Sequence, residues 1–325
     1  MSPPSASHVV TVGETMLRIT PDAGSRLEAA SGARLTAGGA ESNVAVALAS
    51  LGVPTSWIGA LPLNPLGKNV ARMLAAAGVN LEHVHWSDGS RLGLYFVELP
   101  APPRPASVCY DRAGSAMSAM TPSEFNAHAL DHAAYVVTSG ILSALGDNSA
   151  DLTRMVIDEA TKRGVSVCFD LNYRARLWSP KEASAGLRPY LAASQIVVSS
   201  SHDAELLYAV TGSDEARVTA LRDRVAPEAE IVVMTLGERG AIASTADGAL
   251  LRSPSYPCKI IDRFGMGDAF VAGLLFGLLN EDCEFALATA NAAAAMKASC
   301  FGDHFVGDAT ELRAVIAKQG DGVLR

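Results

Sequence analysis

Apolar segments alternate with amphipathic ones through the second half of the chain. Short apolar runs that end in polar residues or glycine lie at 8–14, 135–140, 165–172, 196–201 and 231–237. Residues 151–164 and 203–212 carry apolar side chains at the 3.6-residue spacing of a helix. Apolar strands separated by helices are typical of a parallel sheet covered on both faces. This pattern predicts an α/β body.

The N-terminal part contains further elements of the same body. Residues 37–52 begin with a glycine pair, and Val44, Leu48 and Leu51 then recur at helical spacing until Gly52. The text "SWIGAL" at 56–61 predicts one strand, and residues 67–79 predict a helix. The predicted helices and strands therefore continue the body toward the N-terminus.

Two segments interrupt this rhythm. Residues 17–35 show no helical period, and residues 91–117 contain two strand-like runs joined by the proline-rich "LPAPPRPA". We predict that the two segments pair as one small β-sheet, a lid over one end of the body. The predicted division assigns 17–35 and 91–117 to the lid, and to the body the ranges 1–16, 36–90 and 118–325.

Composition excludes several classes of protein. The chain has 325 residues, 49% hydrophobic and 18% charged, which is enough to bury a large core. Its net charge of −8, without a basic stripe, argues against a nucleic-acid partner. The five cysteines form no CxxC pair, the N-terminus has no signal-peptide pattern, and the longest apolar stretch, Ala269–Leu279, is too short for a bilayer. We therefore expect a cytoplasmic protein without a membrane partner.

The text "DRFGMGDAFVAGLL", from Asp262 to Leu275, carries the strongest chemical pattern. We predict a strand at 257–262, then a glycine turn, then an apolar helix. Ligands of open α/β sheets bind where strands end and helices begin. The backbone amides of Gly265, Met266 and Gly267, together with the helix dipole, would form an anion site.

Asp268 follows this turn directly and falls in the first turn of the predicted helix. We expect the dipole to favour its ionised form, so that it can accept a proton. A carboxylate beside an anion site suits phosphoryl transfer, in which it would orient and deprotonate the attacking hydroxyl. The alternative is that Asp268 only caps the helix. The GxGxxG and Walker patterns both fail on spacing, which argues against a dinucleotide enzyme or a P-loop NTPase.

At this point the chain resembles the PfkB, or ribokinase-like, carbohydrate kinases. "DRFGMGDAFVAG" is similar to that family's second signature, and "GGAESNVAVALASLG" with "GALPLNPLGKNV" to its first. The resemblance implies a three-layer α/β/α body with a β lid, and ATP with Mg²⁺, K⁺ being a further candidate. It implies Asp268 as catalytic base and the backbone of Gly265, Met266 and Gly267 as anion hole. Met266 departs from the usual alanine.

Within the family, "GLYFVE", "VCYDRAGSAMSAMTP", "FDLNYRARLW" and "GDHF" resemble 2-keto-3-deoxygluconate kinases. The resemblance implies a set of sugar-binding residues: Gly38, Gly39, Asn43, Tyr95, Tyr110, Arg112, Arg174 and Asp303. A sugar acid needs positive charge, and the arginine fork suits a carboxylate or phosphate. The alternatives are solvated arginines, and tyrosines that only pack the lid.

The resemblance also implies a set of nucleotide-side residues: Asn172, Ser200, Thr235, Gly237, Gly240 and Asn291. The family's N-x-x-E motif falls on Ser200–Asp203, where serine and aspartate replace asparagine and glutamate. Because these two residues depart from the family motif, no metal ligand is assigned from the resemblance.

The hypothesis that follows is ATP-dependent phosphorylation of 2-keto-3-deoxygluconate to its 6-phosphate by a homo-oligomer. One alternative is a kinase of a neutral ketose such as fructose, for which converging arginines have little use. Another is a non-catalytic sugar-binding relative.

Overall fold

The computed structural model describes residues 8–100 and 103–317. Its main sheet has eight strands, of which six adjacent ones, β12, β11, β10, β9, β1 and β4, are parallel to one another. The order is β14 (Leu250–Ser253), β13 (Ala241–Thr245), β12 (Ile231–Thr235), β11 (Ile196–Ser200), β10 (Ser166–Asp170), β9 (Ala133–Ser139), β1 (His8–Val12) and β4 (Thr55–Ile58). β13 alone runs in the opposite direction, since it pairs antiparallel with both β12 and β14. The predicted α/β body is confirmed.

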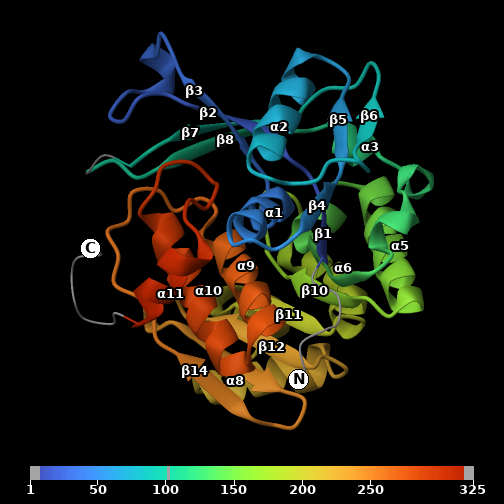
Figure 1. Ribbon diagram of the computed structural model, residues 1–325, viewed down its shortest axis with the longest axis vertical. Helices are drawn as coiled ribbons and strands as arrows, with labels where there is room; N and C mark the ends of the chain where they lie inside the picture. Colours follow the sequence, from blue (N-terminus) through green and yellow to red (C-terminus); the bar gives the residue numbers. More distant parts are fainter. Residues whose placement is uncertain (1–7, 101–102, 318–325) are drawn as a thin grey trace.

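Helices cover both faces of this sheet (Figure 1). One face carries α1 (Ala40–Ser50), α9 (Met266–Asn280) and α10 (Cys283–Ala298), with α11 (Ala309–Ala317) packed on α10. The other face carries α5 (Asp147–Arg163), α6 (Pro180–Ala192), α7 (Ser201–Tyr208) and α8 (Asp214–Val225). Each face has its own apolar core, because strands such as β9 and β12 bury side chains on both sides. The arrangement is the predicted three-layer α/β/α sandwich.

A second sheet of four strands forms the lid (Figure 1). Its order is β3 (Arg34–Gly38), β2 (Met16–Thr20), β7 (Leu94–Glu98) and β8 (Ser107–Asp111). The central pair, β2 and β7, is parallel, with Leu17 opposite Leu94 and Arg18 opposite Tyr95. The two segments predicted to pair therefore do so. The exact division into lid and body domains stays a prediction.

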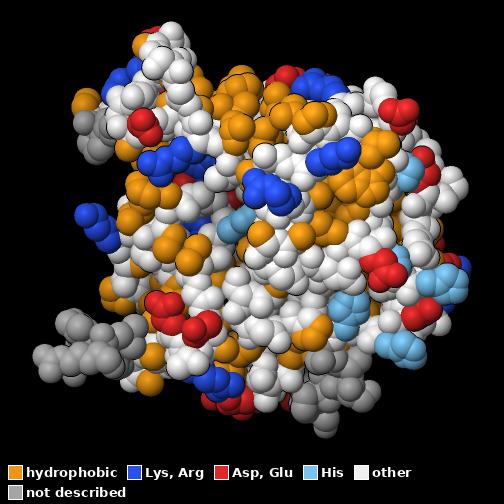
Figure 2. All heavy atoms as spheres, turned by 45° about the horizontal axis from the view of Figure 1, so that its top comes forward, with side chains coloured by type: hydrophobic (Ala, Val, Ile, Leu, Met, Phe, Trp, Pro, Cys, Tyr) orange, Lys and Arg blue, Asp and Glu red, His pale blue; other side chains and the backbone are white. Residues whose placement is uncertain are grey.

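A smaller unit lies beside the lid. It contains the two-stranded sheet β5 (Ala60–Pro62) and β6 (His85–Ser87), and α2 (Pro65–Ala76) and the short helix α3 (Ala116–Ala119) both pack on β5. The short helix α4 (Gly140–Ser143) follows β9 and packs on α5 and α6 of the body. Leu63, Leu66 and Trp86 are exposed here, and Figure 2 shows hydrophobic side chains gathered over this region. Such patches often mark subunit interfaces. The expected homo-oligomer stays a prediction.

Two strand predictions are wrong in detail. Residues 257–262 form no strand, since the N–H groups of Ile261 and Asp262 donate to the Ala298 carbonyl oxygen at the end of α10 and not to a neighbouring strand. The predicted strand at 56–61 is two strands, β4 and β5, separated by Gly59. A Cβ on Gly59 would lie 2.4 Å from the Trp57 ring and 2.5 Å from the Gly13 carbonyl oxygen, so only glycine fits this bend.

Helix α9 is apolar on all sides and almost wholly buried, as predicted for Ala269–Leu279. It packs closely on α10, since a Cβ on Gly277 would lie 2.3 Å from the Cα of Ala286. Among the described residues, no helix has the length and apolar character needed to cross a membrane. The apolar surface of α9 therefore serves the core and holds the N-terminus of α9 at the edge of the sheet.

Candidate active site

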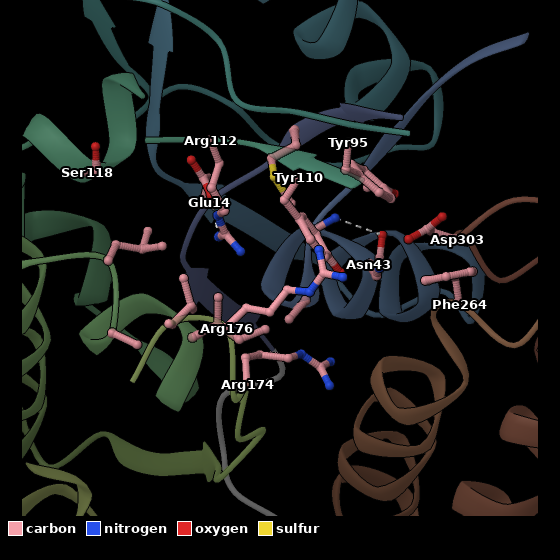
Figure 3. Close-up of a pocket in the computed structure, with 18 of the residues that line it drawn as sticks. Glu14, Asn43, Tyr95, Tyr110, Arg112, Ser118, Arg174, Arg176, Phe264 and Asp303 are labelled. Atoms are coloured by element: carbon pink, nitrogen blue, oxygen red, sulfur yellow. Dashed lines mark hydrogen bonds and ion pairs between the residues drawn. The ribbon is translucent and has the colours of Figure 1, made fainter. Parts of the chain in front are cut away.

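A cavity of about 650 Å³ lies where the carboxyl ends of the parallel strands face the lid (Figure 3). The segment after β1 contributes Glu14, and the segment after β10 contributes Arg174 and Arg176. The lid contributes Tyr95, Tyr110 and Arg112 from above, while Asp303 and Phe264 lie at one side. The location agrees with the rule for ligand sites in open α/β sheets.

The structure brings together every residue predicted to bind the sugar. The cavity is lined by Gly38, Gly39, Asn43, Tyr95, Tyr110, Arg112, Arg174 and Asp303. The Tyr95 and Tyr110 rings stack with centroids 5.9 Å apart, and burial beside Asp303 raises the pKa of Tyr95 well above its usual value. A Cβ on Gly38 would lie 2.0 Å from the Tyr95 hydroxyl, so the chain needs glycine there. The roles assigned to these residues stay predictions, but their positions fit a shared ligand.

Asp268 is buried at the inner end of the cavity, in the first turn of α9. Its Oδ2 accepts a hydrogen bond of 2.7 Å from Asn43 Nδ2. Burial raises its pKa to about 7, although the hydrogen bond from Asn43 and the charge of Arg174 act in the opposite direction. Removal from water is thus the largest influence on this carboxyl group, and the expected effect of the helix dipole on its ionisation stays a prediction. A pKa near 7 suits a general base.

The glycine turn before Asp268 leaves the N-terminus of α9 open. Gly265 is the N-cap residue, with a φ of +82°, and no side chain caps the helix. Asp268 therefore does not cap α9, and the capping alternative is wrong. A Cβ on Gly265 would lie 1.9 Å from the Asp303 carbonyl oxygen, whereas one on Gly267 would meet nothing within 4 Å. Met266 N donates to the Arg263 carbonyl oxygen at 3.4 Å, whereas no partner within residues 8–100 and 103–317 accepts from the N–H groups of Gly267 and Asp268, which stay available to an anion.

Two further acids share this environment, Glu41, which is buried, and Asp170, which is half-buried. Burial raises the pKa of Glu41 to about 7 and that of Asp170 to about 8, and the charge of Asp268 raises both. Glu41 Oε1 accepts a hydrogen bond of 2.5 Å from Ser139 Oγ at the end of β9. The acids titrate as an interacting group, with Arg174 as the nearby positive charge that lowers the pKa of Asp170 and Asp268.

The arginines of the cavity differ in their partners. Arg112 is ion-paired with Glu14, which also accepts a hydrogen bond from Ser115. Sequence reasoning missed Glu14, although its position directly after the first strand could have indicated it. Arg174 and Arg176 form no ion pair within the described part of the chain. Arg176, also missed, adds a second unpaired guanidinium to this side.

The predicted nucleotide-side residues lie outside the cavity. Ser200 and Thr235 are opposite each other at the ends of β11 and β12, and Ser200 Oγ caps α7 by accepting from Asp203 N at 3.0 Å. Asn172 follows β10 with a φ of +40°, and Asn291 donates to the Ser253 carbonyl at 3.1 Å. Gly237 and Gly240 flank the turn after β12, with φ values of +64° and +85°. Their roles in nucleotide binding stay predictions.

Two carboxyl groups near the predicted nucleotide-side residues could bind a metal ion that enters together with the phosphates of a nucleotide. Within residues 8–100 and 103–317, no three His, Cys, Asp or Glu side chains are grouped as a ready-made metal site. Asp170 and Asp203 are nevertheless half-buried carboxyl groups close enough to each other for their charges to interact. Mg²⁺ in phosphoryl-transfer sites is usually held by one or two carboxylates plus the phosphates of the substrate. These residues fit that mode, while the expectation of K⁺ stays untested.

Comparison with known proteins agrees with the geometry. A 2-dehydro-3-deoxygalactonokinase of Haloferax volcanii is 36% identical over 98% of this chain and 99% of its own. The crystal structure of a 2-dehydro-3-deoxygluconokinase from Thermotoga maritima superposes with a TM-score of 0.89 at 32% identity, covering 95% of this chain and 99% of that one. A fructokinase from Vibrio cholerae, solved with fructose, ADP and potassium ion, gives 0.82 at 25% identity, covering 97% and 100%.

The family assignment rests on nearly the whole chain. The profile of the pfkB family carbohydrate kinases matches residues 6–308, a range that includes all three sheets, the glycine turn and Asp268. This chain therefore belongs to the pfkB family of carbohydrate kinases.

Proposed function

We propose that this protein transfers the γ-phosphoryl group of ATP to a 2-keto-3-deoxy sugar acid, with 2-keto-3-deoxygluconate as first candidate and its 6-phosphate as product. One observation carries the proposal: Asp268 and the open end of α9 share one cavity with Arg112, Arg174 and Arg176. A base, an anion site and converging arginines suit an anionic acceptor that is phosphorylated on a hydroxyl.

The proposed reaction uses residues on opposite sides of the cavity. Asp268 Oδ1 accepts the proton of the C6 hydroxyl as its oxygen attacks the γ-phosphorus, the bond to the β-phosphate oxygen breaks, and ADP leaves. Asn43 holds Oδ2 and so orients the carboxylate. The N–H groups after Gly265 stabilise the charge of the phosphoryl group in transfer. Asp170 and Asp203 would hold Mg²⁺, which would neutralise charge on the phosphates of ATP.

The galactonate epimer is the second candidate substrate. The Haloferax volcanii relative, which is named for that sugar acid, is 36% identical to this chain. The two sugar acids share the carboxylate, the keto group and the terminal hydroxyl, and differ in the configuration of one hydroxyl group. Charge recognition by the arginines therefore serves either substrate equally.

Two other hypotheses from the sequence remain as competitors. A neutral ketose such as fructose is supported by the likeness to the Vibrio cholerae fructokinase. A non-catalytic sugar-binding role is disfavoured by the buried Asp268 and the uncapped turn, which a binding protein would not need.

A substrate panel tests the proposal. ADP release is measured with ATP and Mg²⁺ against 2-keto-3-deoxygluconate, 2-keto-3-deoxygalactonate and fructose. We expect kcat/KM for at least one sugar acid to exceed that for fructose by 10²-fold or more, since an unpaired arginine site disfavours a neutral ligand. A preference for fructose would overturn the proposal, and no turnover of any sugar would favour the non-catalytic alternative.

The pH profile should show the titration of Asp268. A general base must be ionised in the free enzyme, so kcat/KM should rise with pH to a plateau, with a midpoint near the pKa of about 7. Arg174 lowers that pKa, so Arg174→Gln should move the midpoint to higher pH. Steady-state kinetics from pH 5.5 to 9 measure both. A midpoint that Arg174→Gln leaves in place would contradict this coupling.

A further inference from the structure

Arg18 is a charged residue inside the lid strand β2, yet it is only 1% exposed. Its neighbours Leu17 and Ile19 are apolar, so the strand pattern alone would place Arg18 on a solvated face. A buried guanidinium is costly unless each part of it is paired. The partners of Arg18 therefore show what the residue does.

Three hydrogen bonds use both ends of the guanidinium. Nη1 donates to Asp303 Oδ1 at 2.6 Å, and Nη2 donates to Asp262 Oδ2 at 2.7 Å. Nε donates to Thr20 Oγ1 at 2.8 Å within the same strand. Arg18 thus connects the lid to two carboxylates of the body, one at the start of the glycine turn and one that lines the cavity.

Asp262 also accepts hydrogen bonds from two backbone segments, the glycine turn and the segment 302–303. Its Oδ1 accepts from Phe264 N in the glycine turn, and its Oδ2 accepts from Gly302 N beside Asp303, both at 3.1 Å. The Phe264 ring also lies under the Arg18 guanidinium, 5.0 Å from its Cζ to the ring centroid. The turn and the 302–303 segment are therefore fixed relative to one side chain of the lid.

A second buried cation completes the cluster. Lys297 is fully buried, and its Nζ lies 3.4 Å from the Asp262 carbonyl oxygen and 3.3 Å from that of Cys300. Arg18 and Lys297 balance the charges of Asp262 and Asp303, so the cluster is neutral as a whole. Burying it is tolerable only while all four groups are in place.

We propose that Arg18 is a positioning residue that couples the lid to the anion-binding turn and to Asp303. The inference rests on the proposed function and adds a means by which a sugar under the lid sets the turn for transfer. Arg18 stands opposite Tyr95, which lines the cavity, and Asp303 contacts the turn where a Cβ on Gly265 would lie 1.9 Å from its carbonyl oxygen. A shift of the lid therefore reaches both sugar-binding and phosphoryl-binding groups.

Arg18→Lys tests the coupling, because lysine keeps the charge but cannot bond to two carboxylates as a planar fork. We expect KM for the sugar acid to rise about tenfold or more and kcat to fall about tenfold. The Kd of an ATP analogue, measured without sugar, should stay within about twofold. A merely structural role would lower the folded fraction but leave KM for the sugar unchanged.

Arg34→Lys is the matched control. Arg34 lies on the neighbouring lid strand β3, its side chain is 68% exposed, and it does not line the cavity. We expect its kinetics to equal those of the wild type. An Arg18→Lys enzyme that behaves like the control, or one that loses ATP and sugar affinity equally, would overturn the inference.

Hydrogen exchange on the wild type decides the case if Arg18→Lys does not fold. Sugar binding should slow amide exchange in β2 and also at Phe264 and Gly302, whose N–H groups bond to Asp262. Protection confined to the lid would overturn the coupling. Failure of the proposed function would appear separately, as wild-type turnover of fructose but no sugar acid, and the exchange experiment would then use fructose.

Discussion

Asp268→Asn is expected to lower kcat by roughly 10²-fold or more, the usual contribution of a general base. The amide has the same shape and can still accept the hydrogen bond from Asn43, so the cavity should keep its geometry. It cannot take a proton from the attacking hydroxyl. The fold should be retained, since a neutral amide removes the cost of ionising a buried carboxyl group whose pKa is raised to about 7. Steady-state kinetics, thermal unfolding and binding of an ATP analogue measure these effects.

Glu284→Gln provides the control for this variant. Glu284 occupies the first turn of α10, a neighbouring helix, and lies outside the cavity. The change removes the same charge from a comparable helix position, so it reports any general effect of first-turn acids. We expect wild-type kcat from it. Near wild-type turnover by Asp268→Asn would instead assign the base to another group.

Local patterns were sufficient for most of the fold. The apolar runs at 135–140, 196–201 and 231–237 are strands β9, β11 and β12, because strands buried on both faces need continuous apolar sequence. The pairing of the two lid segments was predicted because both interrupt the alternation of apolar strands and amphipathic helices. The parallel register of β2 with β7 could not be predicted, since it depends on side-chain packing between segments far apart in the chain.

The incorrect and missing predictions have physical causes that lie beyond local sequence. The strand expected at 257–262 is absent because Ile261 N and Asp262 N bond to Ala298 at the end of α10, and Ile260 is exposed. The raised pKa of Asp268 depends on burial by the completed fold. Arg18 can be buried because Asp262 and Asp303 pair with its guanidinium. These partners lie 244 and 285 residues away in the sequence, so local periodicity could not reveal them.

The two polar residues missed in the cavity differ in how they could have been found. Glu14 ends the text "HVVTVGE", where a strand closes at the sheet edge that binds ligands, so its position carried the information. Arg176 lies two residues after Arg174 in "NYRARLW", and a run of charges in a loop more often indicates a solvated surface. Only the cavity geometry distinguishes that case from a binding site.

The ion pair between Arg112 and Glu14 changes how the role of Arg112 must be tested. Glu14 is 3% exposed, so removing Arg112 alone leaves a buried carboxylate without its counter-charge. That carboxylate would itself repel a sugar acid and destabilise the protein. The informative comparison is therefore Glu14→Gln/Arg112→Ala against Glu14→Gln, which removes the arginine without exposing this charge.

In that comparison we expect loss of Arg112 to weaken transition-state binding of the sugar acid by about 2–5 kcal/mol, the range for a desolvated charge pair that loses one partner. A neutral ketose should lose far less, because it has no carboxylate. Arg34→Ala is the control for lid charge, since the Arg34 side chain is 68% exposed and does not line the cavity; it should change neither substrate appreciably. The measurement is kcat/KM for a sugar acid and for fructose in each variant. Equal losses for both substrates would show that Arg112 supports the lid or the nucleotide, and carboxylate recognition would then rest with Arg174 and Arg176.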